Sequence, residues 1–412
     1  MNTDSDDEQQ NPNDTSGRVT IQKGREKPIR NRHPWIFSRA IIHAEHAMPG
    51  DLVTVSDAAG DFLARGYWNP ASQIQVRILT WDDEPIDEAW WARMLDRAID
   101  ARRAPHLPEA CRLVNAENDY LPGLIVDRYG DWLVLQALTM GIDTRKAMIA
   151  ELLAERLHPA GIYERSDVDA RRKEGLNLVT GLLWGEEPPP RITVALPAGR
   201  VAVDVRQGHK TGTYLDQSAN HALLGELLAQ VAARQHGELP RTLNLFSYSG
   251  GFGLVAAEYG TVVNVDSSRE ALELAEHSLV LNGLPAERAE FIQGDVFQYL
   301  RDAVAEDRRY DVVILDPPKF AHNKQQVQRA SRGYKDINLN ALQVIEPGGY
   351  LLTFSCSGAI DADLFQKIVF GALADSGRQA QVVRHLGPAD DHPVALTFPE
   401  GAYLKGLLLR VY

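Results

Sequence analysis

The sequence predicts an α/β protein in three parts: a small β-rich domain, a central α+β domain and a C-terminal doubly wound α/β domain. After residue 206, short apolar runs alternate regularly with helical patterns, which is typical of parallel βαβ units. Between residues 18 and 97, strand-like runs at 52–55, 62–64 and 74–79 alternate with turns. Residues 98–205 mix strand-like runs with a helical pattern at 146–157. We therefore expect domains at 18–97, 98–205 and 206–412, a number that suits a chain of 412 residues.

The composition indicates a cytoplasmic protein that has no disulfide framework and no metal site built from thiolates. Cys111 and Cys356 are the only cysteines, too few for either arrangement. No stretch is long and apolar enough to cross a membrane, so we expect no membrane partner. Residues 1–17 are polar and acidic, and we expect a disordered tail there. The formal net charge of −13 argues against non-specific adhesion to nucleic acid, so any RNA contact needs a local basic patch.

Such a patch follows the acidic tail. Basic residues crowd between 18 and 39 around a single acid, Glu26, and the aromatic run at 33–37 lies among them. Basic groups beside aromatic rings suit a phosphate backbone and stacked bases. The candidate RNA-binding residues are Lys23, Arg25, Lys27, Arg30 and Arg32. The alternative interpretation of this cluster is a solvated charged face.

A glycine-rich turn in the third domain predicts a cofactor site. Residues 244–253 join a short apolar run to a helical pattern, and the strand-like run 262–266 ends in a carboxylate. Paired glycines let the backbone pass close to a ligand, and a carboxylate at this strand end can accept hydrogen bonds from ribose hydroxyls. Another carboxylate, after a third strand-like run, is a candidate acceptor for the adenine amine. The candidate cofactor-binding residues are Phe246, Ser247, Ser249, Gly250, Gly251, Asp266 and, at the adenine, Asp295. Ordinary turns are the alternative for the glycines and for Asp295.

Two further strand ends carry the candidate catalytic residues. Asp316 follows the buried-looking run 310–315, and the two prolines after it stiffen the backbone and hold the carboxylate in the crevice. Cys356 follows the run 350–355 in a Ser-Cys-Ser-Gly turn, where we expect a partly ionised and strongly nucleophilic thiol. The alternatives are a solvated turn for Asp316 and a small buried apolar residue for Cys356. Together with the glycine turn, these residues predict an S-adenosylmethionine (SAM) methyltransferase with a cysteine placed to attack a base.

Ten short motifs distributed along the chain after residue 17 form a combination of their own, at 23–27, 33–35, 121–127, 164–167, 209–212, 214–217, 244–252, 316–320, 332–335 and 355–358. In these motifs and their spacing, nearly everything after residue 17 resembles the ribosomal RNA large subunit methyltransferase I family. It implies an N-terminal PUA domain, a central α+β domain and a C-terminal Rossmann-like methyltransferase domain. It also implies SAM as the cofactor, large-subunit rRNA as the partner and 5-methylcytosine as the product. The acidic N-terminal extension departs from the family pattern, and we take it to be unrelated to activity.

The resemblance suggests a covalent mechanism, because C5 of cytosine is too weak a nucleophile to take the methyl group directly. Attack of Cys356 at C6 would activate C5, and Asp316 would hold the N3/N4 edge of the base. A base must then remove the C5 proton. Many RNA cytosine methyltransferases carry a second cysteine after the proline of the Asp-x-Pro segment, but this chain has Pro318 and Lys319 there. Water and Lys319 are therefore the candidates for this step.

Two other functions remain open from the sequence. One is a SAM-dependent RNA methyltransferase that acts on a base nitrogen, in which Cys356 has no catalytic role. The other is a non-catalytic RNA-binding relative, which the retained glycines and carboxylates disfavour. The sequence does not determine the oligomeric state, and a homodimer is one alternative.

Overall fold

The computed structural model describes residues 17–103, 106–235, 237–321 and 323–412. The predicted acidic tail lies outside these residues, except for Gly17 at the start of the first strand. The chain divides into two compact units, one formed by Met1–Pro188 with Pro393–Gly401 and the other by Pro189–His392 with Ala402–Tyr412. No helix in the described part of the chain is long and apolar enough to cross a lipid bilayer.

The first unit begins with a six-stranded sheet in the order β2-β6-β5-β4-β1-β3. Its strands are β1 (Gly17–Ile21), β2 (Trp35–Phe37), β3 (Ile41–Glu45), β4 (Leu52–Ser56), β5 (Phe62–Trp68) and β6 (Ile74–Thr80), with the short helix α1 (Lys27–Arg30) between β1 and β2. Alternate apolar residues on these strands, such as Val19, Ile21, Val53 and Val55, are fully buried. The sequence pattern identified β4, β5 and β6 through their apolar residues, at 52–55, 62–64 and 74–79, but it did not predict β1, β2 or β3.

A second sheet in the same unit has five strands in the order β11-β10-β9-β8-β7. The elements are α2 (Glu88–Asp100), β7 (Ala110–Asn115), β8 (Leu124–Tyr129), β9 (Trp132–Ala137), α3 (Met140–Asp143), α4 (Lys146–Leu157), β10 (Gly161–Ser166) and β11 (Val179–Gly185). Helix α2 starts where the Asp87 side chain accepts a hydrogen bond from the backbone N–H of Trp90 at 2.8 Å, which satisfies one free donor of the first turn. Sequence analysis predicted α4 with these bounds but did not predict β11, whose side chains are mostly exposed.

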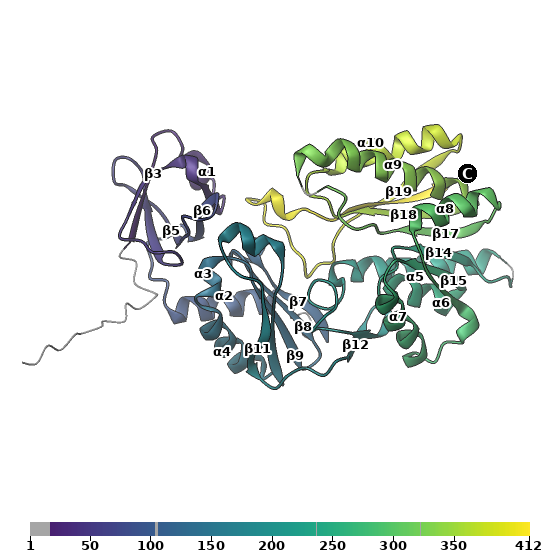
Figure 1. Cartoon of the computed structure of the whole chain (residues 1–412), viewed down its shortest axis with the longest axis horizontal. Coiled ribbons are helices and arrows are strands. Elements are labelled where there is room, and N and C mark those ends of the chain that lie inside the picture. The colour runs from purple at the N-terminus through teal and green to yellow at the C-terminus, as the bar shows by residue number, and fades with distance from the viewer. Residues whose placement is uncertain (1–16, 104–105, 236, 322) are drawn as a thin grey trace, which may run out of the picture. The chain divides into compact units, whose positions relative to one another are not determined.

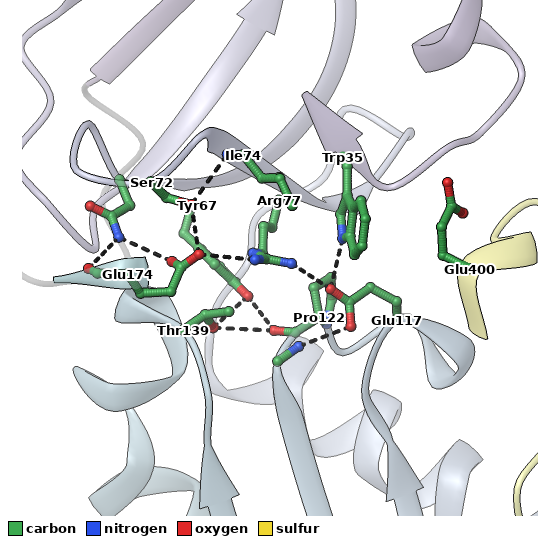
Figure 2. Close-up of polar contacts among 12 residues, drawn as sticks. Trp35, Tyr67, Ser72, Ile74, Arg77, Glu117, Pro122, Thr139, Glu174 and Glu400 are labelled. Carbon is green, nitrogen blue, oxygen red and sulfur yellow. Dashed lines mark hydrogen bonds and ion pairs between the residues drawn. The ribbon is translucent and has the colours of Figure 1, made fainter. Parts of the chain in front are cut away.

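A largely buried cation on the first sheet of this unit pairs with carboxylates from two connections between strands of the second sheet (Figure 2). Arg77 on β6 donates to Glu117 at 2.6 Å and to Glu174 at 2.9 Å. Glu117 also accepts from the indole N–H of Trp35 at 2.8 Å, and Glu174 accepts from Ser72 at 2.7 Å. Two carboxylates buried in this way depend on the one guanidinium for compensation of their charge.

The short segment Pro393–Gly401 belongs to the first unit although its chain neighbours belong to the second. The Phe398 ring lies edge-on to Trp35, with centroids 4.8 Å apart. The carbonyl of Pro393 accepts from the side chain of Asn115 at 3.1 Å, and the N–H of Ala395 donates to Asn118 at 3.1 Å. The chain therefore passes between the units three times.

The second unit contains a seven-stranded sheet in the order β16-β15-β14-β17-β18-β20-β19. Its strands are β14 (Arg241–Leu245), β15 (Thr261–Asp266), β16 (Ala289–Gln293), β17 (Tyr310–Leu315), β18 (Ile345–Ser355), β19 (Ala380–Leu386) and β20 (Lys405–Val411). The pairs among β14 to β18 are all parallel, and β20 runs antiparallel to both of its neighbours. A separate hairpin of β12 (Ile192–Leu196) and β13 (Gly199–Val203) precedes this sheet.

Six helices cover the seven-stranded sheet on its two faces (Figure 1). Helices α5 (Ser218–Arg234), α6 (Gly251–Tyr259) and α7 (Arg269–Leu281) lie on one face. Helices α8 (Val296–Ala305), α9 (Val327–Gln343) and α10 (Ala362–Ser376) lie on the other. Apolar residues on the central strands β14, β17 and β18, such as Leu243, Leu315 and Leu351, are fully buried, as is expected for parallel strands with helices on both sides.

Candidate active site

A cavity of about 490 Å³ opens at the carboxyl ends of the parallel strands. The strand order reverses between β14 and β17, and ligands of open α/β sheets bind at such a switch point. The turns that follow β14, β15, β17 and β18 contribute Phe246, Asp266, Asp316 and Cys356 to its wall. The loop before α5 contributes a further part of the wall, including Lys210, Tyr214 and Asp216.

The turn after β14 holds an unusual backbone conformation. Phe246, Tyr248 and Gly250 have φ angles of 59°, 45° and 78°, so every second residue lies in the left-handed region. Such conformations cost free energy in residues other than glycine and gather at ligand sites. The Tyr248 hydroxyl fixes the turn from outside, because it accepts from the N–H of His209 at 2.7 Å and donates to the carbonyl of Gly212 at 3.1 Å.

The two glycines of this turn are also required by the packing of the protein itself. A Cβ at Gly250 would come within 2.6 Å of the Ala275 side chain, and a Cβ at Gly251 would come within 2.5 Å of the His221 ring. Gly251 lines the cavity, whereas Gly250 borders a separate small void behind the turn. Gly251 therefore makes room for a side chain as well as for a ligand.

Asp266 lies at the end of β15 and faces the cavity. Its carboxylate accepts from the backbone N–H groups of Tyr248 at 2.8 Å and Ser268 at 2.9 Å. These two bonds orient the carboxylate and leave further lone pairs on both oxygens, so it can also accept from hydroxyl groups of a ribose.

Asp295 has a different environment. Its side chain accepts from the N–H of Gln298 at 2.8 Å and caps the N-terminus of α8. It is not among the residues that line the cavity, although Asp266 pairs with Gln293 only two residues before it, so contact between Asp295 and the adenine amine stays a prediction. Phe246, Ser247, Ser249 and Gly251 do line that cavity.

Two side-chain amides near the start of α5 orient Asp316 through hydrogen bonds in series. The Gln217 side chain donates to its carboxylate at 2.9 Å, and Asn220 in turn donates to the side-chain amide oxygen Oε1 of Gln217 at 2.6 Å. Burial raises the pKa of Asp316 to about 7, and the nearby negative charge of Asp216 adds to this rise. At neutral pH the protonated and the ionised forms of Asp316 therefore have similar free energies, so this carboxyl can accept or donate a proton.

Cys356 is half-buried at the end of β18, with Sγ 4.0 Å from the carbonyl oxygen of Pro317. Burial raises the pKa of the thiol above its usual value, and Asp316 raises it further, while Lys210 opposes the rise. The expectation of a partly ionised thiol therefore needs correction, because this environment favours the protonated form at neutral pH. The Cys356 thiol can therefore act as a nucleophile only when another group accepts its proton.

Buried polar groups fix the turn around Cys356. Lys405 donates to the carbonyls of Ser357 at 2.8 Å and Ile360 at 2.6 Å. The Tyr334 hydroxyl lies 3.0 Å from the hydroxyl of Ser355 and 3.1 Å from that of Ser357. The two serines that flank Cys356 thus anchor the turn below the cavity, which leaves the thiol facing the cavity.

Sequence analysis did not assign several side chains that line the cavity. It gave no role to Lys210, Asp216, His221 or Tyr403, all of which line the cavity. Asp216 accepts from Lys210 at 2.8 Å and from Tyr403 at 2.6 Å. The motif at 214–217 was a sequence signal for Asp216. Tyr403 lies almost two hundred residues further along the chain, and only the fold places it beside Asp216.

The five candidate RNA-binding residues are all exposed on and around α1 in the first unit. Arg30 forms an ion pair with Asp57 at 3.0 Å. Beside the cluster lies a groove of about 420 Å³ that is lined by Arg25, Arg39 and the rings of Trp35 and Phe37, among others. Cationic and aromatic groups thus share one surface of the described chain.

The geometry fits SAM in its residue types. One wall offers a carboxylate for a ribose, a tight turn with polar side chains lies beside it, and a carboxyl and a thiol face the same space. Residues 185–410 match the family described as S-adenosylmethionine-dependent methyltransferase, and residues 19–81 match the family described as a PUA-like domain. The chain is thus a SAM-dependent methyltransferase with an N-terminal PUA-like domain, and SAM is its cofactor.

Relatives at high identity define the family more closely. A protein from Shewanella amazonensis named ribosomal RNA large subunit methyltransferase I is 47% identical over 402 residues, which cover 96% of this chain and 99% of that protein. Proteins of the same name from Tolumonas auensis and Escherichia coli are 46% and 43% identical, each over at least 95% of both chains. The chain belongs to the ribosomal RNA large subunit methyltransferase I family.

Two solved structures share the fold over nearly the whole chain. A proposed SAM-dependent methyltransferase from Streptococcus mutans has a TM-score of 0.80 at 20% identity and covers 95% of this chain and 99% of its own. A methyltransferase structure complexed with SAH has a TM-score of 0.81 at 20% identity with the same coverage. The predicted fold class is confirmed by these matches and by the two matching families.

Proposed function

We propose that this enzyme methylates C5 of a cytosine in large-subunit rRNA through a covalent bond between Cys356 and C6 of the base. The observation that supports this most is that one cavity holds the thiol of Cys356, the carboxyl of Asp316 and the cofactor turn. The relatives at 43–47% identity are named for ribosomal RNA of the large subunit, which supports that RNA as the substrate.

The first step must activate a cytosine ring that is a weak carbon nucleophile. The Cys356 thiol loses its proton, and its sulfur forms a bond to C6. The C5=C6 electron pair then moves toward C4, and the C4=N3 pair moves to N3, which takes up a proton. Asp316 suits the delivery of this proton, because its pKa of about 7 lets it receive a proton from the thiol side and donate one to N3. The result is an enamine with a nucleophilic C5.

SAM, when bound, supplies the electrophilic methyl group that C5 takes up. The later steps restore the aromatic ring. A base removes the C5 proton, the freed electron pair re-forms the C5=C6 bond, and the C6–S bond breaks so that Cys356 leaves. The N3 proton returns to Asp316. Lys319 and water remain our candidates for the base, and Lys319 lines the cavity.

The PUA-like domain is the proposed site of additional RNA contact. Lys23, Arg25, Lys27, Arg30 and Arg32 would neutralise phosphates, and the groove beside them offers aromatic rings on which bases can stack. This contact would add affinity for RNA beyond that of the reacting base.

The decisive experiment separates carbon methylation from nitrogen methylation. RNA with 5-fluorocytosine at the target should trap the wild-type enzyme as a covalent complex, because fluorine cannot leave C5 as a proton does. Cys356→Ala should form no complex and give no product while it still binds SAM. Cys111→Ala is the matched control and should still be trapped, since Cys111 is buried in the first unit.

Mass spectrometry of the nucleosides identifies the product of the untrapped reaction. We expect 5-methylcytidine from large-subunit rRNA. A methyl group on a base nitrogen, or full activity of Cys356→Ala, would overturn the covalent mechanism and favour methylation of nitrogen.

A further inference from the structure

Three polar atoms on the cavity wall are buried and have no hydrogen-bond partner among the described residues. They are Oδ1 of Asp216, Nδ1 of His221 and Oγ of Ser247. The three residues are 2%, 6% and 7% exposed, so water does not solvate them freely. A buried polar group without a partner costs about 1–3 kcal/mol, and a bound ligand is one way to recover that cost.

His221 lies in the first turn of α5, with its ring against the cofactor turn. The ring contacts Phe252 edge-on, with centroids 4.5 Å apart, and occupies the space that a side chain at position 251 would need. Burial lowers the pKa of His221 to about 4, so the ring is neutral and can donate one hydrogen bond. The negative charge of Asp216 opposes this lowering.

Asp216 presents the opposite charge on the same wall. Lys210 and Tyr403 both donate to its Oδ2 and hold its pKa well below the usual range, so it is ionised. Its second oxygen remains available as an acceptor. One ionised acceptor and two neutral donors match a group that carries both an ammonium and a carboxylate.

We propose that Asp216, His221 and Ser247 bind the amino-acid end of SAM, with Asp216 accepting from the ammonium and His221 and Ser247 donating to the carboxylate. The start of α5 is thereby a part of the cofactor site in addition to the glycine turn. The proposal depends on the cofactor alone and is independent of which atom of the base is methylated. It also gives a reason for Gly251, since only glycine there leaves room for the His221 ring.

Three thioethers that share the adenosine part test this assignment by calorimetry. SAH carries both charged groups, S-adenosyl-3-thiopropylamine lacks only the carboxylate, and 5′-methylthioadenosine lacks both. His221→Ala should weaken SAH roughly tenfold to hundredfold, which is the expected loss of a hydrogen bond to a charged group, and should leave the other two ligands unchanged. Asp216→Asn should weaken both SAH and the amine but spare 5′-methylthioadenosine.

Matched controls distinguish recognition from folding. His221→Asn places an amide nitrogen near the position of Nδ1 and should recover part of the SAH affinity. His385→Ala removes an exposed histidine on β19 and should change nothing. Unchanged binding of 5′-methylthioadenosine shows that each variant has a folded site.

Two results would overturn the proposal. Equal weakening of all three thioethers by His221→Ala would show that the ring only supports the turn. Unchanged SAH affinity in Asp216→Asn would remove Asp216 from the cofactor site and assign its free oxygen to the target base.

Discussion

Replacement of Asp316 by Asn should stabilise the protein, and the gain should grow as the pH rises. The native structure raises the pKa of this carboxyl from 3.8 to about 7, so the folded protein holds the proton more tightly than the unfolded chain. The wild type therefore loses stability as the pH rises from about 4 to about 7. Asn carries no charge and avoids this loss.

The size of the effect follows from the pKa shift. Each pH unit between the two pKa values adds about 1.4 kcal/mol to the cost of ionising Asp316 in the folded state. Between pH 5 and pH 7 the upper limit is thus about 3 kcal/mol. The carboxyl is only half-buried and faces a cavity that water can enter, so we expect a gain of about 1–2 kcal/mol over this interval.

Urea unfolding at pH 5 and pH 7, followed by circular dichroism and by tryptophan fluorescence, measures this gain. All seven tryptophans lie between residues 35 and 184, so fluorescence reports on the first unit, whereas Asp316 lies in the second. Asp390→Asn, which changes an exposed carboxylate of the second unit, is the control and should show no such pH dependence. An Asp316→Asn gain that is the same at both pH values would refute the burial argument.

Three other substitutions test separate parts of the molecule. Asp266→Asn should weaken SAM binding by about tenfold to hundredfold in calorimetry, because a ribose loses a charged acceptor, and unchanged affinity would remove Asp266 from the site. The combined replacement of Arg25, Lys27, Arg30 and Arg32 by Ala should flatten the plot of log binding constant for RNA against log salt concentration. The slope should fall in magnitude by about 0.7–0.9 for each phosphate that is no longer neutralised, while SAM affinity stays intact. An unaltered slope would mean that the cluster is a solvated face. Arg77→Met should destabilise the first unit by about 3–5 kcal/mol, seen as an earlier fluorescence transition in urea, because Glu117 and Glu174 stay buried without their cation. Wild-type stability in Arg77→Met would show that the two carboxyls become neutral at little cost.

The sequence predicted the elements whose patterns are local. Strand β17 and helix α4 were predicted with their observed bounds, because a mostly apolar run and a helical period are visible within a dozen residues. Strands β19 and β20 were not predicted, although they complete the sheet. Most of β19 is exposed at the sheet edge, so it lacks the apolar signal of a central strand.

The candidate site likewise contains residues that a local sequence pattern could identify and properties that depend on the fold. Gly251, Asp266, Asp316 and Cys356 could be proposed because each follows a strand-like run, and the fold brings their turns to one cavity. The thiol's raised pKa could not be foreseen, since it depends on burial and on Asp316, which is far away in sequence. Likewise, the cap formed by Asp295 depends on where α8 begins, and a Gly-Asp pair alone does not reveal this.

The segment Pro393–Gly401 has a consequence for how the protein is made. Its contacts with Trp35, Asn115 and Asn118 complete the first unit, yet residues 189–392 of the other unit precede it in the chain. During synthesis from the N-terminus, this surface of the first unit therefore stays uncovered until residues 189–392 have been made. A fragment that ends at Pro188 would emerge with the Trp35 ring lacking its aromatic neighbour Phe398, so neither unit corresponds to a single uninterrupted stretch of the gene product.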